Sequence, residues 1–285
     1  MFAYIKAILF ALLGGISAVL PLSATANVSF LNKIFGGTAG ELHFYLGMVM
    51  FGAAAAILLL YYRQIYDVLF SGSEKLRRKP EYGVQVPMFR FKDIIIGCAP
   101  LLLLFFPIGK GLFVFNISDL ILDKHLALVE GIALIFSGVM YFAAITKSIR
   151  QKKYTKFNTF SAAATGVAQM LSAILPGTSR TGLTFSTAVM FRHRRNKSVA
   201  FSHILSFPAL ICGGFLHIII GSASASAVPV FALVLTFVLS VFSSAFGVLV
   251  FSAAAGEKKS RFFSYINIAL GLIAVISFVI RLLIK

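Results

Sequence analysis

One strongly charged side chain stands deep inside an apolar stretch of the sequence. Arg180 lies in the run Leu175-Pro176-Gly177-Thr178-Ser179-Arg180-Thr181-Gly182, within an otherwise apolar region from Phe160 to Phe191. Burying an arginine in apolar surroundings costs several kcal/mol unless it meets an anion, so anion binding is the expected function. Two alternatives without a functional site stay open: Arg180 lies at the surface in a turn, or it pairs with a buried carboxylate such as Glu130.

The neighbours of Arg180 indicate which anion it would bind. Gly177 and Gly182 let backbone N–H groups approach a ligand closely, and a helix beginning after Gly182 would direct its positive end at the same point. A guanidinium in such a nest can bind phosphate through two parallel hydrogen bonds. Further hydroxyl donors come from Thr178, Ser179, Thr181 and Thr184.

The whole chain has the composition of a membrane protein. Of its 285 residues, 59% are hydrophobic and only 12% are charged, with a mean hydropathy of +0.93, whereas charged residues make up roughly a quarter of a soluble domain. The net charge of +17 does not indicate nucleic-acid binding, because Lys and Arg stand in short clusters between apolar stretches. Cys98 and Cys212 lie within apolar stretches, so they predict neither a disulfide framework nor a zinc site.

Six apolar stretches are long enough to cross a membrane as helices. They run over residues 43–62, 94–115, 126–145, 199–221, 228–252 and 262–283. Two further apolar regions, residues 3–35 and 160–191, are each broken by a proline and a run of small polar residues. Neither of these two predicts a continuous helix.

Basic residues predict the orientation, because Lys and Arg near the ends of spans stay on the cytoplasmic side. Most of them fall in four segments, residues 63–92, 147–156, 192–197 and 258–261. All four are expected in the cytoplasm, and both termini outside. This works only if region 160–191 enters from the cytoplasm and returns to it as a re-entrant hairpin, while the first broken region forms a hairpin from the opposite side.

The two broken regions also match in sequence. Ser17-Ala18-Val19-Leu20-Pro21 matches Ser172-Ala173-Ile174-Leu175-Pro176, and Phe30 and Phe185 keep this register. With opposite orientations, the match predicts an inverted-topology repeat in one membrane domain over residues 1–285, with halves of about 1–145 and 146–285. Such repeats place half-helix ends around a site near the membrane midplane.

A different interpretation of the first region is a cleaved signal peptide. Lys6, the apolar run after it and the small residues Ala24-Thr25-Ala26 before Asn27 fit that pattern. Against it, the apolar run continues through Pro21 without a clear boundary, and the segment matches an internal region that no signal peptidase would remove.

The run from Pro176 to Thr184 resembles the PGxSRSGxT signature of the bacterial undecaprenyl-diphosphate phosphatases, the BacA/UppP family. The similarity continues in Gly166-Val167-Ala168-Gln169, Ala200-Phe201-Ser202 and Phe207-Pro208. It implies an all-α protein of the bacterial plasma membrane with six helices and two opposed hairpins. It also implies hydrolysis of a polyprenyl diphosphate to the monophosphate in recycling of the cell-wall lipid carrier for peptidoglycan biosynthesis, and hence bacitracin resistance.

The family's other signature, roughly E-G-x-T-E-F-L-P-V-S-S-T-G-H, lies in the first hairpin, and there this chain departs from it. The framework Leu20-Pro21-Leu22-Ser23 matches, as does Thr25, but Gly14 and Ala18 stand at the glutamate positions and Asn27 at the histidine position. In the family those carboxylates serve metal coordination and acid–base or nucleophile activation. The resemblance thus implies Mg²⁺ or Ca²⁺ as cofactor, without identifiable ligands here. Losing a general base alone typically costs about 10² to 10⁴ in rate.

Replacement groups would have to come from a short set of side chains. Glu130 lies within a span and Glu41 flanks one, whereas Asp119 and Asp123 lie near an external mouth. Among the histidines, His203 is the one expected near the second motif. For each of these residues a purely structural function is the expectation, and a function in the chemistry is the alternative.

Two hypotheses from different classes follow. In the first, Arg180 and the surrounding glycines and hydroxyls bind the diphosphate. Thr25 and Asn27 face it from the first hairpin, and Ser23 or Ser179 is the nucleophile. In the second, the chain has lost hydrolysis and binds a polyprenyl phosphate or moves it across the bilayer, which needs no carboxylates. A transporter of another small anion is a third alternative. The expected partners are an isoprenoid lipid (di)phosphate, membrane lipids and, as an open alternative, a second copy in a homodimer.

Overall fold

The computed structural model describes the backbone of residues 2–70, 89–109, 112–121, 123–223, 228–255 and 258–283. Within these ranges, the side chains of residues 2, 118–120, 123–124 and 258–259 are outside the description. The basic segments 63–92 and 258–261 and the side chains of Asp119 and Asp123 therefore lie wholly or partly outside the described residues.

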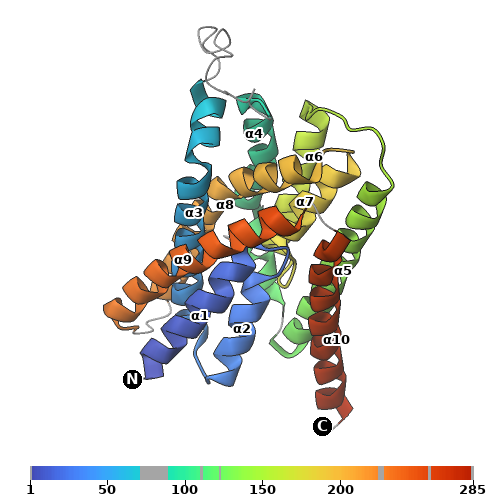
Figure 1. Cartoon of the computed structure of the whole chain (residues 1–285). Coiled ribbons are helices and arrows are strands. Elements are labelled where there is room, and N and C mark those ends of the chain that lie inside the picture. The colour runs from blue at the N-terminus through green and yellow to red at the C-terminus, as the bar shows by residue number, and fades with distance from the viewer. Residues whose placement is uncertain are drawn as a thin grey trace.

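The described chain is mostly helical (Figure 1). The first half contains α1 (Phe2–Val19), α2 (Ala24–Ile34), α3 (Ala39–Phe70), α4 (Phe91–Cys98), η3 (Ala99–Phe105), β1 (Pro107–Gly109), β2 (Leu112–Phe113), η4 (Val114–Leu120) and α5 (Asp123–Ile149). The second half contains α6 (Thr159–Ile174), α7 (Arg180–Met190), α8 (Arg195–Ala223), α9 (Val230–Ala254), η5 (Lys258–Arg261) and α10 (Phe262–Leu283).

Five described helices, α3, α5, α8, α9 and α10, are long and apolar enough to cross a membrane. Their most apolar windows have mean hydropathies between 2.0 and 2.4. Large apolar side chains cover their outer faces, among them Phe231 on α9 and Ile273 on α10. Contiguous exposed apolar surface of this kind is suited to lipid and not to water. The chain is therefore a multi-pass membrane protein.

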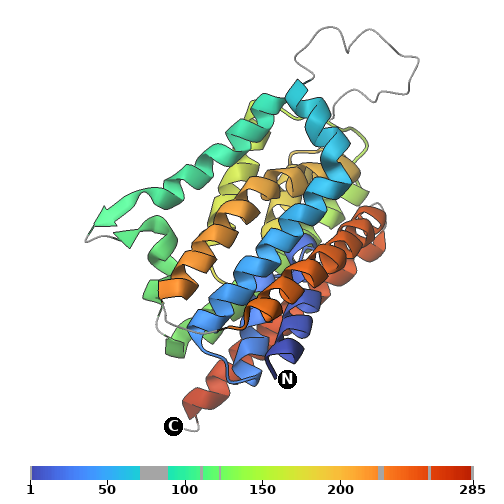
Figure 2. The same cartoon turned by 90° about the vertical axis from the view of Figure 1, so that its left-hand side faces the viewer.

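The sixth predicted span, over residues 94–115, is not a continuous helix. The α-helix ends at Cys98, a 3₁₀ helix follows, and β1 pairs with β2 in a short antiparallel hairpin with Pro107 opposite Phe113. Pro100 lies in the first turn of η3, where its missing N–H leaves no helical bond unmade, and Gly109 turns the chain with φ of 112°. Figure 2 shows this segment as an arm that projects from the helices.

Both broken regions fold as two helices joined by a short non-helical break, α1 with α2 and α6 with α7. The sequences before the breaks align as predicted, but α2 and α7 begin at N-caps Ser23 and Ser179, which are one residue further apart. Phe30 therefore corresponds to Ser186 and not to Phe185. Phe30 is 62% exposed and Phe185 is fully buried, so the predicted Phe30–Phe185 register is wrong.

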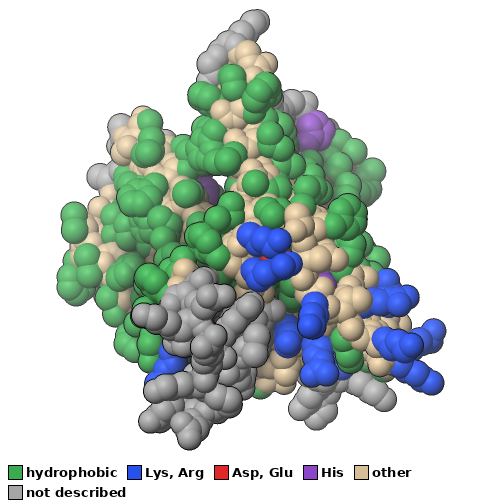
Figure 3. All heavy atoms as spheres, turned by 90° about the horizontal axis from the view of Figure 1, so that it is seen from above, with side chains coloured by type: hydrophobic (Ala, Val, Ile, Leu, Met, Phe, Trp, Pro, Cys, Tyr) green, Lys and Arg blue, Asp and Glu red, His purple; other side chains and the backbone are tan. Residues whose placement is uncertain are grey.

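Basic segments 147–156 and 192–197 lie at the opposite end of the molecule from the two termini. In Figure 1 both termini are at the lower end, whereas α3 ends and α4 and α6 begin at the upper end. Seen from that upper end, Lys and Arg side chains gather on the surface (Figure 3). Segments 147–156 and 192–197 connect helices at this end. Which side of the membrane it faces stays a prediction.

Close contacts between helices position the two breaks. α1 packs along α9, and α6 along α4 and η3. Where α5 crosses α10, a Cβ added at Gly131 would lie 2.8 Å from the Gly271 carbonyl oxygen. Glycines at this crossing let the two backbones approach closely, as in many membrane helix pairs.

Candidate functional site

The two hairpins meet at their breaks, next to Arg180. The Arg180 guanidinium donates through Nη2 to the Ala18 carbonyl oxygen at 3.3 Å, and the Thr181 hydroxyl donates to the same oxygen at 3.2 Å. A Cβ built at Gly182 would lie 3.5 Å from Pro21 Cβ. The negative end of α1 thus faces the positive end of α7, an arrangement that helix dipoles favour.

Side chains of the second half hold the other free carbonyls at the end of α1. The last carbonyls of a helix have no partner within it. Here His203 Nε2 lies 2.9 Å from the Val19 carbonyl oxygen, and Asn267 Nδ2 donates to the Pro21 carbonyl oxygen at 2.7 Å. Three carbonyls of the first break therefore bind side chains from α7, α8 and α10.

The second break is held mainly by its own residues. The Thr178 hydroxyl lies 2.7 Å from the Leu175 carbonyl oxygen and 3.1 Å from that of Ser172. Gly177 has φ of 91°, and a Cβ there would lie 2.6 Å from the backbone of Glu130. Thr178 and Gly177, predicted to bind substrate, therefore shape the break and its packing on α5.

The start of α7 is capped, and its hydroxyls have protein partners. Ser179 Oγ accepts from the Gly182 N–H at 3.0 Å, while the Ser179 N–H donates to Ser137 Oγ on α5 at 3.0 Å. One turn further along, Thr184 Oγ1 contacts Ser202 Oγ on α8. Gly182 and Thr184 thus take part in the cap and in the contact between α7 and α8.

Arg180 keeps donors that the protein does not use. Its side chain is partly exposed, and among the described residues its Nε has no hydrogen-bond partner. Glu130 forms an ion pair of 3.8 Å with Lys33. Among the described residues, the alternative pairing of Arg180 with Glu130 is not found. Arg180 therefore has hydrogen-bonding capacity left for an anion at the meeting point of the two hairpins.

The predicted residues of the first hairpin are bonded within that hairpin. Ser23 Oγ accepts from the Ala26 N–H at 3.2 Å and lies 3.2 Å from Thr25 Oγ1. Asn27 Nδ2 donates to Ser17 Oγ at 2.7 Å. The backbone of Ala18 and the Pro21 ring contact the second hairpin. Both residues were matched to family motifs from the sequence, but neither was predicted to make this contact.

The side chains around the two breaks do not fit a protein-held Mg²⁺ or Ca²⁺. These ions prefer carboxylate and other hard oxygen ligands, whereas the breaks bring together hydroxyls, amides and a guanidinium. Within the described part of the chain, no group of three or more His, Cys, Asp or Glu residues comes together. Three described carboxylates are in ion pairs: Glu41 with Lys6, Asp93 with Arg90, and Glu130, whose backbone packs on the second break, with Lys33.

Sequence reasoning missed two groups that hold the breaks, Asn267 at the first break and Ser137 at the second. Asn267 is fully buried in α10, and a lone amide inside an apolar span is the same kind of signal that identified Arg180. Ser137 gives no comparable signal, since serines are common in spans. His203 was singled out, but its bond to α1 depends on a contact between distant helices.

The chain is similar to known proteins over most of its length. The family model described as bacitracin resistance protein BacA matches residues 7–273 of the chain. The chain belongs to the BacA family. A curated undecaprenyl-diphosphatase of Tropheryma whipplei strain TW08/27 is 25% identical over 95% of this chain and 98% of its own. Another, of Prochlorococcus marinus strain MIT 9515, is 23% identical over 96% and 99%. A third, of Caldicellulosiruptor bescii, is 27% identical over 75% of each chain.

Proposed function

We propose that this BacA-family protein hydrolyses a polyprenyl diphosphate to the monophosphate at the junction of its two hairpins. The observation that carries the proposal is Arg180, which lies between the breaks with a buried Nε that has no hydrogen-bond partner among the described residues. The curated relatives are named undecaprenyl-diphosphatase. A membrane-embedded arginine beside a helix N-terminus suits a lipid whose phosphate head must sit within the protein.

Binding would proceed through the guanidinium and the start of α7. The anion would exchange with the Ala18 carbonyl for Nη2 of Arg180 and gain charge-assisted hydrogen bonds. The N-terminal dipole of α7 adds to the same potential. Such preorganised positive groups would also stabilise charge that develops on the transferred phosphoryl group.

In the reaction, an oxygen nucleophile forms a bond to the terminal phosphorus while the anhydride P–O bond breaks. Water as the overall nucleophile gives inorganic phosphate and polyprenyl phosphate. The hydroxyls of Ser23 and Ser179 are the sequence candidates for a covalent route. Both serve as N-caps, and neither is hydrogen-bonded to a carboxylate or histidine in the described structure. Arg180 is therefore the stronger candidate for the residue that activity requires.

A second function, binding or translocation of a polyprenyl phosphate without hydrolysis, is favoured by one observation. At both breaks, the described hydrogen bonds involve hydroxyls, amides, an imidazole and a guanidinium, and no carboxylate takes part. Binding needs only these groups, whereas hydrolysis needs a base or a metal ion. A transporter could use the predicted inverted repeat to expose the site alternately to each side.

We further propose that the protein lies in the bacterial plasma membrane with its basic end in the cytoplasm. Lys and Arg at segments 147–156 and 192–197 support this orientation through the positive-inside rule. Both termini would then be external. Accessibility of single cysteines at Lys152 and at Tyr4 to a membrane-impermeant thiol reagent in intact cells tests the orientation. Labelling at Tyr4 alone supports it, and labelling at Lys152 alone contradicts it.

The function is tested by phosphate release from undecaprenyl diphosphate by detergent-purified protein, with and without added Mg²⁺ or Ca²⁺. Arg180→Ala is expected to lower kcat/KM by about 10²-fold or more, the usual effect of removing one transition-state donor. Thr181→Val is the matched control, because it removes the other bond to the Ala18 carbonyl without removing charge. It is expected to cost about tenfold at most.

The outcomes separate the two functions. Release that depends on Arg180 supports hydrolysis. Lipid-phosphate binding that depends on Arg180, without release under any metal condition, supports the non-hydrolytic function. Equal losses in Arg180→Ala and Thr181→Val would show that Arg180 acts only by joining the hairpins, which contradicts both functions.

A further inference from the structure

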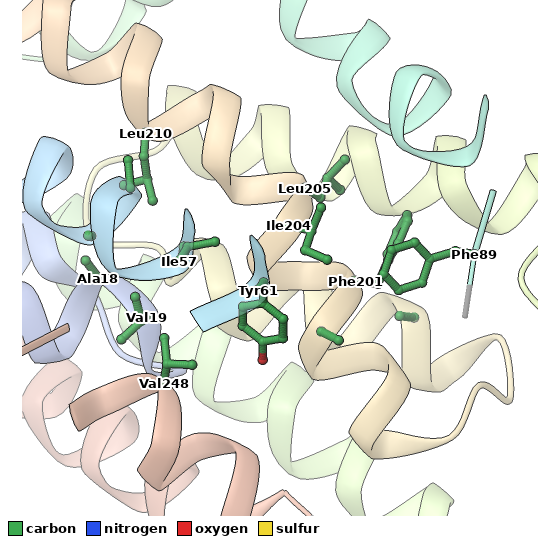
Figure 4. Packing of buried hydrophobic residues seen from close by; sticks show 14 of the residues in the cluster. Ala18, Val19, Ile57, Tyr61, Phe89, Phe201, Ile204, Leu205, Leu210 and Val248 are labelled. Atoms are coloured by element: carbon green, nitrogen blue, oxygen red, sulfur yellow. The ribbon is translucent and has the colours of Figure 1, made fainter. Parts of the chain in front are cut away.

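His203 on α8 reaches the end of α1 at the break of the first hairpin. Its Nε2 lies 2.9 Å from the Val19 carbonyl oxygen, and its Nδ1 lies 3.1 Å from the Tyr61 hydroxyl oxygen. His203 is fully buried and Tyr61 is 8% exposed. Figure 4 draws Tyr61 in the buried apolar cluster that also contains Ala18 and Val19. Six helices, α1, α3, α6, α7, α8 and α9, contribute buried residues to this cluster.

The chemistry of the partners determines which ring nitrogen carries the hydrogen. A backbone carbonyl only accepts, so His203 Nε2 donates to Val19. No carboxylate hydrogen-bonds the ring in the described structure, and a buried unpaired charge would be costly, so the ring is neutral. Its Nδ1 then accepts from the Tyr61 hydroxyl. Donation from Tyr61 therefore stabilises the tautomer that the Val19 carbonyl requires.

The bond from His203 is next to the bonds that Arg180 makes. Ala18 and Val19 are neighbours, so the carbonyl that His203 holds constrains the carbonyl that Arg180 and Thr181 share. If an anion draws the guanidinium away from Ala18, the bond to Val19 still fixes the end of α1. We propose that His203, oriented by Tyr61, is a positioning residue that keeps the first break formed beside Arg180 while Arg180 binds a lipid phosphate. The ligand in this inference rests on the proposed function.

The first arm of the test needs no ligand. Pro21→Cys with Gly182→Cys, in a Cys98→Ala/Cys212→Ala background, forms a disulfide if the breaks are in contact, since their Cβ separation of 3.5 Å suits one. His203→Phe keeps an aromatic ring but loses both nitrogens, whereas His203→Gln keeps a donor for Val19. Disulfide formation is expected to slow about tenfold in His203→Phe and less than about threefold in His203→Gln, as for one buried hydrogen bond.

The second arm measures the Kd of undecaprenyl phosphate in detergent micelles, with cysteine-free protein. His203→Phe is expected to raise the Kd about tenfold and Tyr61→Phe about threefold, with His203→Gln close to the unaltered protein. In an Arg180→Ala background, His203→Phe should raise the Kd no further, because it acts through Arg180. A purely structural effect would add to the loss in that background.

Several results would overturn the proposal. One is an unchanged disulfide rate and Kd in a monodisperse His203→Phe protein. Another is an equal loss in the Phe and Gln variants, which would show that ring packing alone matters. Absence of lipid binding by the unaltered protein would instead overturn the proposed function and the ligand part of this inference. The disulfide rates would still show whether His203 holds the break.

Discussion

Hairpin α1–α2 and hairpin α6–α7 have second helices of 11 residues each, and each of these helices begins at a serine N-cap. They also end alike. A phenylalanine caps each helix, and the next residue has a left-handed backbone, Gly36 with φ of 59° in the first hairpin and Arg192 with φ of 64° in the second. The two hairpins therefore share one backbone design from break to C-cap.

They differ in what holds the break. The second break satisfies its carbonyls with its own Thr178, whereas the first depends on Arg180, His203 and Asn267 from the other half. The first hairpin is thus held in place by the second half of the chain. Arg180 therefore joins the hairpins. Under the proposed function it also binds the anion, so experiments must separate the two effects.

The largest effect on stability is expected from Gly177→Ala, which tests the packing of the second break. A side chain there would combine a φ of 91° with a contact of 2.6 Å to the Glu130 backbone. It should lower the free energy of unfolding by about 3 kcal/mol or more. Gly36→Ala is the matched control, with φ of 59° and nothing within 4 Å of the added Cβ. It should cost only about 1 kcal/mol. Equal losses on thermal unfolding in detergent would contradict this account of Gly177.

Removing the Asn267 amide on α10 tests whether the first break depends on the second half of the chain. Asn267→Leu leaves the Pro21 carbonyl unpaired, at a cost of about 1 to 2 kcal/mol. Ser137→Ala perturbs the second break instead, since it removes the acceptor of the Ser179 N–H. Hydrogen exchange should rise around residues 16–23 in the first variant and around residues 176–182 in the second. The opposite pattern, or the same pattern in both, would refute the assignment.

Two threonines at equivalent positions of the hairpins, Thr25 and Thr181, test which hairpin contributes more to lipid-phosphate binding. Thr25 and Thr181 each lie two residues after a serine N-cap, but only Thr181 bonds across to the other hairpin. Thr181→Val is expected to weaken lipid-phosphate binding about threefold to tenfold, and Thr25→Val less than about threefold. The Kd of undecaprenyl phosphate measures both. A stronger effect from Thr25→Val would move the site toward the first hairpin.

The smallest expected effect is on the pH dependence of the free energy of unfolding. His193 follows α7, stacks on Phe157 at 3.8 Å and is buried, whereas Gly37 holds the matching position after α2. Burial lowers the pKa of His193, opposed by its bond to the Thr155 carbonyl and by Asp93. The unfolded state then binds the proton more tightly, so stability is lost as pH falls below about 6.5. His193→Phe should remove less than about 1 kcal/mol of the loss between pH 7.5 and pH 5. An unchanged pH dependence of unfolding would contradict the assignment.

Some features could be predicted from the sequence because they follow from local chemistry. Apolar runs predicted the five long helices, prolines predicted both breaks, and Arg180 was identified by its charge in an apolar region. Other features depend on contacts that composition does not encode. The predicted span over residues 94–115 is rich in apolar residues, and among the residues that interrupt it are Pro100, Pro107 and Gly109. The one-residue change of register was hidden by a chance match of two phenylalanines.

The most direct test of the meeting of the hairpins at Arg180 is disulfide formation between Pro21→Cys and Gly182→Cys in native membranes, in the background free of other cysteines. A rapid intramolecular disulfide is expected, because the two Cβ positions are 3.5 Å apart. Pro21→Cys with Phe160→Cys is the control, since Phe160 begins α6 at the far end of the second hairpin and is 71% exposed. A disulfide that forms no faster in the first pair than in the control would contradict the account.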